Sequence, residues 1–186
     1  MIFDTKEKGF TIVELMVVFI IFGIILAISF VGFKDNQQKV ILDSTAFKLV
    51  ANIRKQQSIA GLYDASCVDS ENYKYGHGIY FTTIKKGKGV YILFSDCDGD
   101  NYITKPSPWD TAESIPFPSG VVQIESISVD GNLISELNIV FNPPGPSVII
   151  NGLLENSTAI IKINLISDTL KTKTITVNKV GMIDID

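Results

Sequence analysis

Apolar residues follow one another almost without interruption from Phe10 to Phe33, and the polar exceptions are Thr11, Glu14 and Ser29. A helix of 24 residues spans about 36 Å, which is enough to cross the hydrocarbon core of a bilayer. One acid costs at most about 3.5 kcal/mol on an insertion scale, against roughly 5–10 kcal/mol of favourable free energy from the apolar side chains. The pattern therefore predicts a single membrane-spanning helix over residues 10–33.

The helical pattern continues after the apolar run. Residues 34–60 contain no Gly or Pro, and residues at spacings of three and four include Val40, Phe47, Val50, Ala51 and Arg54. Such spacings place side chains on one face of an amphipathic helix, and we expect this face to pack on a sheet. Gly61 predicts the end of the helix.

From Gly78 onward the apolar residues follow the period of strands. Two hairpins are predicted, one from residues 79–82 and 90–94 and one from residues 121–129 and 133–141, the second around the turn Asp130-Gly131-Asn132. Further strands are expected at residues 147–151, 159–166, 173–178 and 182–185. Residues 104–120 hold four of the seven prolines and read as a loop. One long helix followed by adjacent antiparallel strands predicts an α+β fold.

The residues around the start of the apolar run carry the most specific signal. Lys8-Gly9-Phe10-Thr11-Ile12-Val13-Glu14-Leu15 resembles the prepilin signature of type IV pilins and type II secretion pseudopilins. The resemblance implies that a prepilin peptidase cuts between Gly9 and Phe10 and methylates the new amine of Phe10. It also implies a pilin-like build, in which the long N-terminal helix packs on an antiparallel, β-rich head.

Glu14 is the only charged residue between Phe10 and Phe33. The resemblance implies that its carboxylate meets the amine of Phe10, on its own subunit or a neighbour, as subunits dock into a filament. A buried carboxylate and a buried ammonium each lose hydration that they recover only as a pair, so an unpaired Glu14 penalises a subunit out of register. The alternative is that Glu14 lies at the headgroup level and snorkels to water.

Together with this resemblance, the sequence pattern predicts four segments: a cleaved leader at 1–9, a membrane and filament-core helix at 10–33, an amphipathic helix at 34–61 and an extracytoplasmic head at 62–186. A secretory signal peptide fits less well, because its apolar core has 7–15 residues and its cleavage site is A-x-A-like. We expect a single-pass protein of the cytoplasmic membrane with its head outside, which later joins an extracytoplasmic filament. The expected partners are other pilin or pseudopilin subunits and the peptidase.

Two features bear on the kind of subunit. Pilins usually carry a Gly in the membrane helix and a Pro eight residues later; Gly23 fits, but Val31 stands at the second position. The chain also resembles H-type minor pseudopilins and related minor pilins in several short stretches: 52–58, 75–81, 93–96, 176–177 and Gly181. This resemblance implies a minor pilin or pseudopilin with a structural or assembly role.

The composition bears on nucleic acid as a partner. The formal net charge is −4 and the pI is about 5.0, so no broad basic footprint is present. Minor pilins that serve DNA uptake carry a Gly-Arg pair near the C-terminus, where this chain has Gly181-Met182. Lys171, Lys173 and Lys179 leave some positive charge nearby. A module that takes up DNA or binds a surface ligand is therefore the alternative function, although nucleic acid binding is not the expectation.

Cys67 and Cys97 are the only cysteines, and both fall in the extracytoplasmic part. An even pair in an oxidising compartment favours a disulfide. The bridge would close a loop of about 30 residues and stabilise the fold by roughly 3–4 kcal/mol in the chain-entropy model. Two buried free thiols are the alternative.

Asp96, Asp98 and Asp100 alternate around Gly99, as carboxylates do at the start of a calcium loop. The spacing is imperfect, since position twelve counted from Asp96 is Ser107 rather than a Glu. A plain Asp-Gly turn at a strand end explains the residues equally well. We expect no cofactor, with Ca²⁺ at this loop as the open alternative.

Catalytic motifs are missing from the sequence. His77 is the only histidine, which excludes a metal site with several histidines, and no Cys-x-x-Cys, P-loop or nucleophile elbow is present. Between Gly76 and Gly78, His77 reads as a loop residue. An enzyme is not expected.

Overall fold

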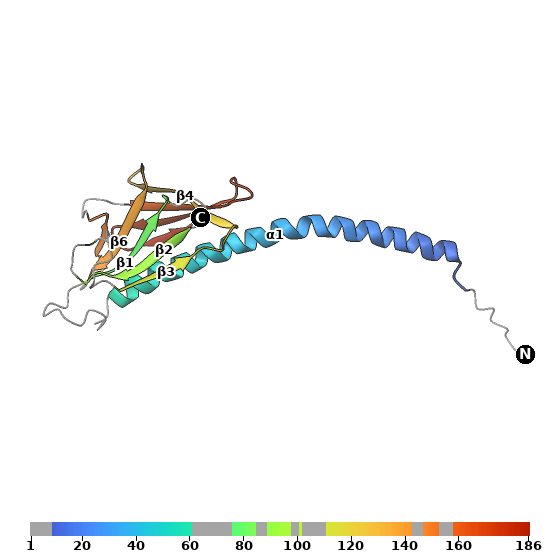
Figure 1. Ribbon diagram of the computed structural model, residues 1–186, viewed down its shortest axis with the longest axis horizontal. Coiled ribbons are helices and arrows are strands. Elements are labelled where there is room, and N and C mark those ends of the chain that lie inside the picture. Colours follow the sequence, from blue (N-terminus) through green and yellow to red (C-terminus); the bar gives the residue numbers. More distant parts are fainter. Residues whose placement is uncertain are drawn as a thin grey trace, which may run out of the picture. The chain divides into compact units, whose positions relative to one another are not determined.

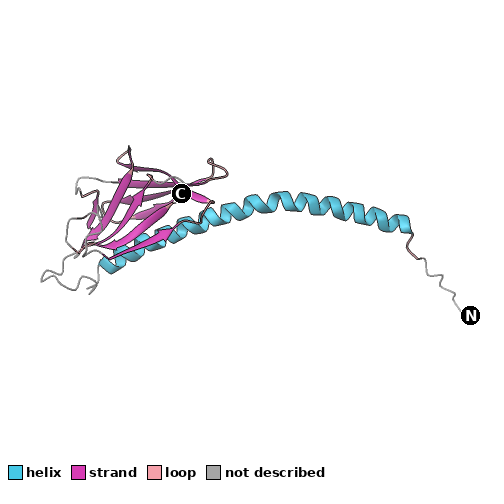
Figure 2. Ribbon diagram, in the orientation of Figure 1, coloured by secondary structure: helices cyan, strands magenta, loops and turns pink. Residues whose placement is uncertain are grey.

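The structure is a computed structural model that describes residues 9–60, 76–84, 89–97, 101, 111–142, 147–152 and 158–186, without the side chains of residues 29–35 and 111 (Figure 1). The chain divides into two compact units, Met1–Gln38 and Lys39–Asp186. Helix α1, Ile12–Ala60, belongs to both (Figure 2). The second unit also contains ten strands among its described residues, and it is the folded head of the molecule.

Helix α1 is amphipathic in the second unit. Its buried face consists of side chains at most 5% exposed: Leu42, Ala46, Leu49, Val50 and Ile53. Leu42, Ala46, Leu49 and Ile53 follow one another at spacings of four, three and four residues, and Val50 lies four residues after Ala46, so these side chains form one stripe. The predicted helix is confirmed, and its last residue, Ala60, directly precedes Gly61.

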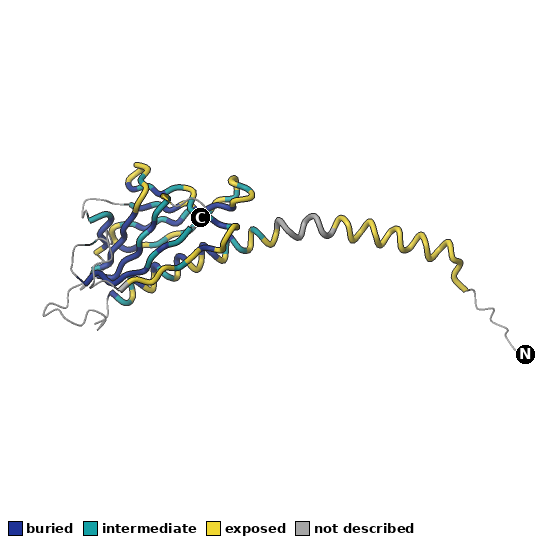
Figure 3. The backbone as a smooth tube through the Cα atoms, in the orientation of Figure 1, coloured by how far each residue is buried: buried dark blue, intermediate teal, exposed yellow. Residues whose placement is uncertain are grey.

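The predicted buried face of this helix is wrong. Of its five residues only Val50 is buried, whereas Val40 is 65% exposed and Phe47 is 63% exposed. Along the part of α1 in the head, the tube alternates between buried and exposed colours (Figure 3). The sequence offers two apolar stripes on this stretch of helix, and periodicity alone does not rank them. The head covers the stripe that begins at Leu42 and leaves the stripe through Val40 and Phe47 in contact with solvent.

The first sheet has five strands in the order β3-β2-β1-β6-β7, and every neighbouring pair is antiparallel. Its strands are β1 His77–Thr82, β2 Val90–Ser95, β3 Thr111–Pro116, β6 Glu136–Asn142 and β7 Ser147–Ile150. The hairpin predicted from residues 79–82 and 90–94 is confirmed as β1 and β2, with Ile79 opposite Leu93.

The second sheet also has five antiparallel strands, in the order β10-β9-β8-β4-β5. Its strands are β4 Val122–Val129, β5 Asn132–Ile134, β8 Thr158–Leu165, β9 Thr172–Asn178 and β10 Ile183–Ile185. The predicted turn after β4 is confirmed, since Asp130 and Gly131 have φ of 49° and 85°. Positive φ at both central residues is the signature of a type I′ turn, whose twist fits a two-residue hairpin.

The strand predicted over residues 133–141 is wrong as a single element. It breaks at Ser135 into β5, which pairs with β4, and β6, which joins β1 in the other sheet. Leu133 in β5 is 77% exposed, whereas Leu137 in β6 is fully buried. The chain therefore changes sheet at Ser135, and β6 rather than β5 contributes a fully buried leucine to the core.

The loop predicted over residues 104–120 is also wrong in part, because it contains β3. This strand lies at the edge of its sheet, where Pro116 opposite Val90 is tolerated. Its segment Thr111-Ala112-Glu113-Ser114 lacks an apolar alternation, so no local pattern indicated a strand there. Pairing with β2 defines the strand.

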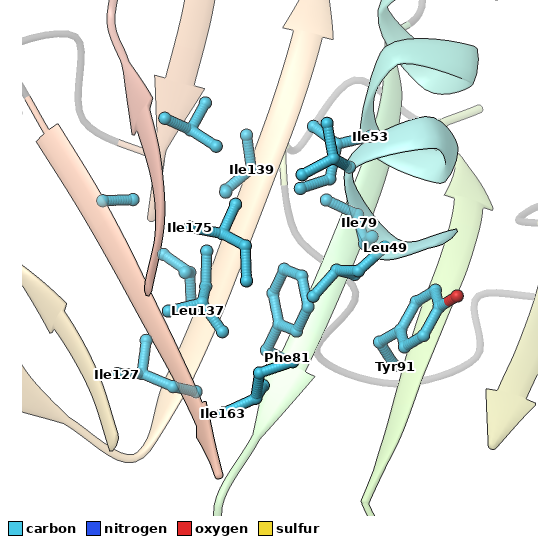
Figure 4. Packing of buried hydrophobic residues seen from close by; sticks show 14 of the residues in the cluster. Leu49, Ile53, Ile79, Phe81, Tyr91, Ile127, Leu137, Ile139, Ile163 and Ile175 are labelled. Carbon is cyan, nitrogen blue, oxygen red and sulfur yellow. The ribbon is translucent and has the colours of Figure 1, made fainter. Parts of the chain in front are cut away.

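One core joins the helix and both sheets (Figure 4). Leu49 and Ile53 from α1 meet fully buried side chains of the first sheet, such as Phe81, and of the second, such as Ile163. Tyr91 joins this core between Phe81 and Phe117, with ring centroids 6.0 and 5.3 Å away. The arrangement is the α+β fold that the sequence predicts.

Candidate functional site

The predicted cleavage junction lies just before α1. Gly9 and Phe10 are exposed, and Phe10 has 84% of its surface accessible. A Cβ atom added at Gly9 would meet no heavy atom within 4 Å, and its φ is not in the left-handed region. The described structure of the subunit therefore does not require glycine at position 9.

Thr11 and Glu14 close the first turn of α1 by three reciprocal hydrogen bonds. The Thr11 hydroxyl accepts the amide N–H of Glu14 at 3.3 Å, and Glu14 Oε2 accepts both the amide N–H and the hydroxyl of Thr11 at 3.1 Å. This is a capping box, which satisfies backbone donors that a helix start otherwise leaves unpaired. It was not among the predicted features, although Thr-x-x-Glu before an apolar run is its sequence signature.

The capping box changes the expectation for Glu14. The sequence led us to expect a carboxylate without a partner until assembly, whereas Thr11 already binds one of its oxygens. The amide N–H of Thr11 belongs to the Phe10–Thr11 peptide bond, so hydrolysis between Gly9 and Phe10 leaves the box intact. The carboxylate remains exposed and stands four residues from the amine that cleavage would create.

The apolar side chains after Glu14 are uncovered. Every residue from 12 to 28 is exposed, and the exposed fraction of the large apolar side chains ranges from 48% at Val17 to 81% at Ile12. Within the described residues, whose side chains leave out 29–35, no helical segment has the length and hydropathy that a membrane span requires. The membrane span over residues 10–33 stays a prediction.

The described part of the acidic loop is organised around Asp96. Its side chain is 1% exposed, and its Oδ2 accepts the amide N–H of Asn101 at 3.0 Å. Asn101 has φ of 62° and also accepts a hydrogen bond from the side-chain amide of Asn142 at 3.1 Å. One carboxylate of the cluster thus closes its own loop, as in an Asp-Gly turn.

The other two carboxylates, Asp98 and Asp100, lie outside the described residues. In the part of the chain that the structure describes, no group of three His, Cys, Asp or Glu side chains could hold a metal. Calcium binding by this loop stays a prediction.

Cys97 follows directly after Asp96 and is 8% exposed. It is not a free thiol, and the described part of the chain contains no free cysteine. Cys67 lies outside the described residues, so the Cys67–Cys97 pairing stays a prediction.

The interpretation of His77 as a loop residue is wrong. It is the first residue of β1, it is 6% exposed, and its Nδ1 lies 3.2 Å from the hydroxyl of Ser95 on β2. Gly78 next to it packs under the ring of Phe94, where an added Cβ would clash with Cζ. Glycine beside His77 therefore marks close packing in a strand rather than a loop.

The family comparison places a known motif on the junction and the first turns of α1. Residues 4–30 match the prokaryotic N-terminal methylation motif, which includes Gly9, Phe10 and Glu14. No curated protein and no solved structure matches the chain. This motif, at the start of a helix that leads into antiparallel sheets, supports a relationship of the chain to the type IV pilin and pseudopilin superfamily.

Proposed function

We propose that this chain is a minor pilin or minor pseudopilin that is incorporated into a type IV pilus or a type II secretion pseudopilus. Its role is structural, in assembly, rather than catalytic. The N-terminal methylation motif supports a subunit that a prepilin peptidase processes. The observation that carries the proposal is Gly9, a glycine that the subunit's own structure does not require, placed in that motif next to an exposed Phe10.

Processing begins with hydrolysis of the peptide bond between Gly9 and Phe10. It leaves a carboxylate on the leader and an amine on Phe10, which is then methylated. The capping box holds Glu14 at the first turn of the helix with one oxygen already bound by Thr11. Its negative charge attracts the amine of Phe10 on a neighbouring subunit, and the ion pair sets the register of the two chains.

The apolar half of α1 occupies two environments in turn, first the membrane and then the filament. Before assembly, residues 10–33 anchor the subunit in the cytoplasmic membrane, because bare apolar side chains are stable there and not in water. During assembly, the same side chains pack among the helices of neighbouring subunits. The absence of a Pro eight residues after Gly23 and the resemblance to H-type subunits support the minor class.

The mass of the processed protein tests cleavage. Gly9→Ala, or a larger residue, is expected to leave the leader on the chain when it is expressed with a prepilin peptidase. Gly23→Ala is the matched control, since its added Cβ also meets no atom within 4 Å. Normal cleavage of the Gly9 variant, read by intact-mass spectrometry, would contradict the proposal.

Two substitutions at Glu14 separate its charge from its capping role. Glu14→Gln keeps an oxygen that accepts the hydrogen bonds of Thr11, whereas Glu14→Ala removes both the acceptor and the charge. Both variants are expected to be cleaved, and both should lose co-assembly in pull-downs from filament preparations. Wild-type assembly of Glu14→Gln would show that the charge does not set the register.

DNA uptake receives less support from the surface near the C-terminus. Lys171 pairs with Asp168 at 3.4 Å and Lys173 pairs with Asp43 at 3.5 Å, so two of the three lysines there already face an acid. Affinity for DNA that is independent of sequence rests on several phosphate contacts. A gel shift of the full chain in detergent, at low and moderate salt, tests this function; salt-sensitive micromolar binding would favour it over assembly alone.

A further inference from the structure

The hairpin of β8 and β9 ends in a turn, residues 166–171, which we call the hairpin tip. Leu170 in this tip is 91% exposed, more than any other large apolar side chain that the structure describes, and Ile166 is 40% exposed. The side chain of Asp168 accepts the amide N–H of Leu170 at 3.2 Å, and its carbonyl accepts the amide N–H of Lys171 at 3.1 Å. The turn is therefore closed by its own hydrogen bonds, while the head covers almost none of Leu170.

The hairpin tip lies at the end of the head where α1 enters it. Lys173, just after the tip, pairs with Asp43 at 3.5 Å, and Asp43 comes four residues after Lys39, the first residue of this unit. The far end of β9 lies near the last turns of α1, since Gln57 donates to the carbonyl of Gly181 at 2.9 Å. In Figure 1 the hairpin is the red loop at the end of the head from which α1 leaves.

This end of the head cannot lie far from the predicted membrane span. Five residues, 34–38, separate Phe33 at the end of the span from Lys39. Even a fully extended chain covers only about 20 Å over that distance, whatever the orientation of the two units. A head on so short a tether meets the bilayer surface far more often than a free protein does. An exposed leucine at this end therefore gains free energy by entering the interface of the bilayer.

The lysines beside Leu170 do not favour a contact based on charge. Lys171 pairs with Asp168 within the tip at 3.4 Å, and Lys173 pairs with Asp43 of α1 at 3.5 Å. Anionic lipid is attracted by clusters of unpaired basic residues, and each of these two lysines already faces an acid. The apolar side chains of the tip are thus the groups that can hold it on a membrane, and they bind zwitterionic lipid as well as anionic lipid.

We infer that the hairpin tip rests on the surface of the bilayer before assembly and inserts Leu170, together with Ile166, between the lipid headgroups. The inference rests on the proposed function, because residues 10–33 must anchor the chain in the same membrane. The head then has a contact with lipid of its own, in addition to the anchor. The subunit gives up this contact when it leaves the membrane for the filament.

Quenching of fluorescence by lipid tests the contact on the full chain, reconstituted in phosphatidylcholine vesicles. Leu170→Cys carries the fluorophore NBD, and part of the lipid carries a nitroxide quencher on its acyl chain. The label at position 170 is expected to lose about half of its fluorescence, because an interfacial group lies within reach of the acyl chains. The unsubstituted chain, treated in the same way, corrects for labelling of the native cysteines.

Leu133→Cys is the matched control. Leu133 is an exposed leucine of β5, with 77% of its surface accessible, and it follows the turn at Asp130. The amide of Asp130 donates to the carbonyl of Thr158, at the start of β8, whereas the hairpin tip follows the end of β8. The two leucines thus lie at opposite ends of the second sheet, and the label at position 133 should keep its fluorescence.

Three outcomes would overturn the inference: no quenching at position 170, equal quenching at positions 170 and 133, or quenching at position 170 only when anionic lipid is added. Phe19→Cys, within the predicted span, separates the inference from the proposed function. Quenching at position 19 without quenching at position 170 contradicts the hairpin contact alone. If position 19 is not quenched, the proposed anchor is wrong and the hairpin contact falls with it.

Discussion

The two halves of α1 share one secondary structure and differ in what their apolar residues contact. Between Lys39 and Ala60 the head buries one stripe completely, as at Leu49 and Ile53, and leaves the opposite face to solvent. Between Ile12 and Ile28 every side chain is exposed. Other parts of the same chain thus cover one face of α1 between Lys39 and Ala60, whereas they cover none of the side chains between Ile12 and Ile28.

This difference shows where the partner of each half comes from. Soluble monomers rarely expose apolar patches larger than a few hundred Å². A helix that is apolar on all sides is stable only when surrounded, by lipid or by other helices. Residues 12–28 therefore need an environment that the chain does not supply, which agrees with a subunit that moves from a membrane into a filament.

The largest expected effect separates the two halves with one type of substitution. Phe81→Ala removes a fully buried ring from the head core and should lower the free energy of unfolding by about 3–5 kcal/mol. Phe19→Ala removes a ring that is 68% exposed and should change it by less than about 0.5 kcal/mol. Urea unfolding of the full chain in detergent measures both, and equal losses would break the comparison.

A smaller effect is expected from glycine substitutions in the two units. Gly78→Ala forces a Cβ into the space of the Phe94 ring, and the ring must move at a cost of about 1–3 kcal/mol. Gly23→Ala meets no atom and should leave the unfolding midpoint of the head unchanged. A Gly78 variant as stable as the wild type would show that the Phe94 ring packs loosely against β1.

The pH dependence of the head should depend on Tyr91. Burial raises the pKa of Tyr91 above its ordinary value of 10.0, the hydrogen bond from Asn52 lowers it, and Glu113 raises it further. The unfolded chain therefore releases this proton first, so stability is complete below pH 10 and falls as pH rises toward the folded pKa. Tyr91→Phe should reduce the loss of unfolding free energy above pH 10, as measured by urea titrations. Burial also raises the pKa of Tyr80, so Tyr80→Phe measures how much of the remaining loss comes from that second tyrosine.

The smallest effect is expected at the ion pair between α1 and β9. Asp43 and Lys173 lie 3.5 Å apart with side chains 35% and 32% exposed, so the pair contributes at most about 1 kcal/mol. Asp43→Asn should reduce stability at low salt, and the difference from wild type should vanish at about 1 M salt because ions screen the pair. A loss that does not depend on salt would point to hydrogen bonding rather than charge.

Residue pattern and tertiary packing determined different parts of this fold. The helix and most strands followed from apolar periodicity, because that signal is local. Strand β3 and the break at Ser135 did not, since β3 depends on pairing with β2 and the break depends on which sheet buries Leu137. His77 likewise is a strand residue because it pairs with Ser95 of β2 and Phe141 of β6, which no local pattern indicated.

The sequence by itself determined the N-terminal methylation motif with Gly9 and Phe10, the acid at position 14 and the apolar run, because each is a matter of residue type at a fixed spacing. Only the tertiary structure decided which stripe of α1 the head covers, since the stripe that starts at Leu42 and the one that starts at Val40 have equally good helical spacing. The two sheets cover one side of the helix and leave the other side, with Val40 and Phe47, in contact with solvent.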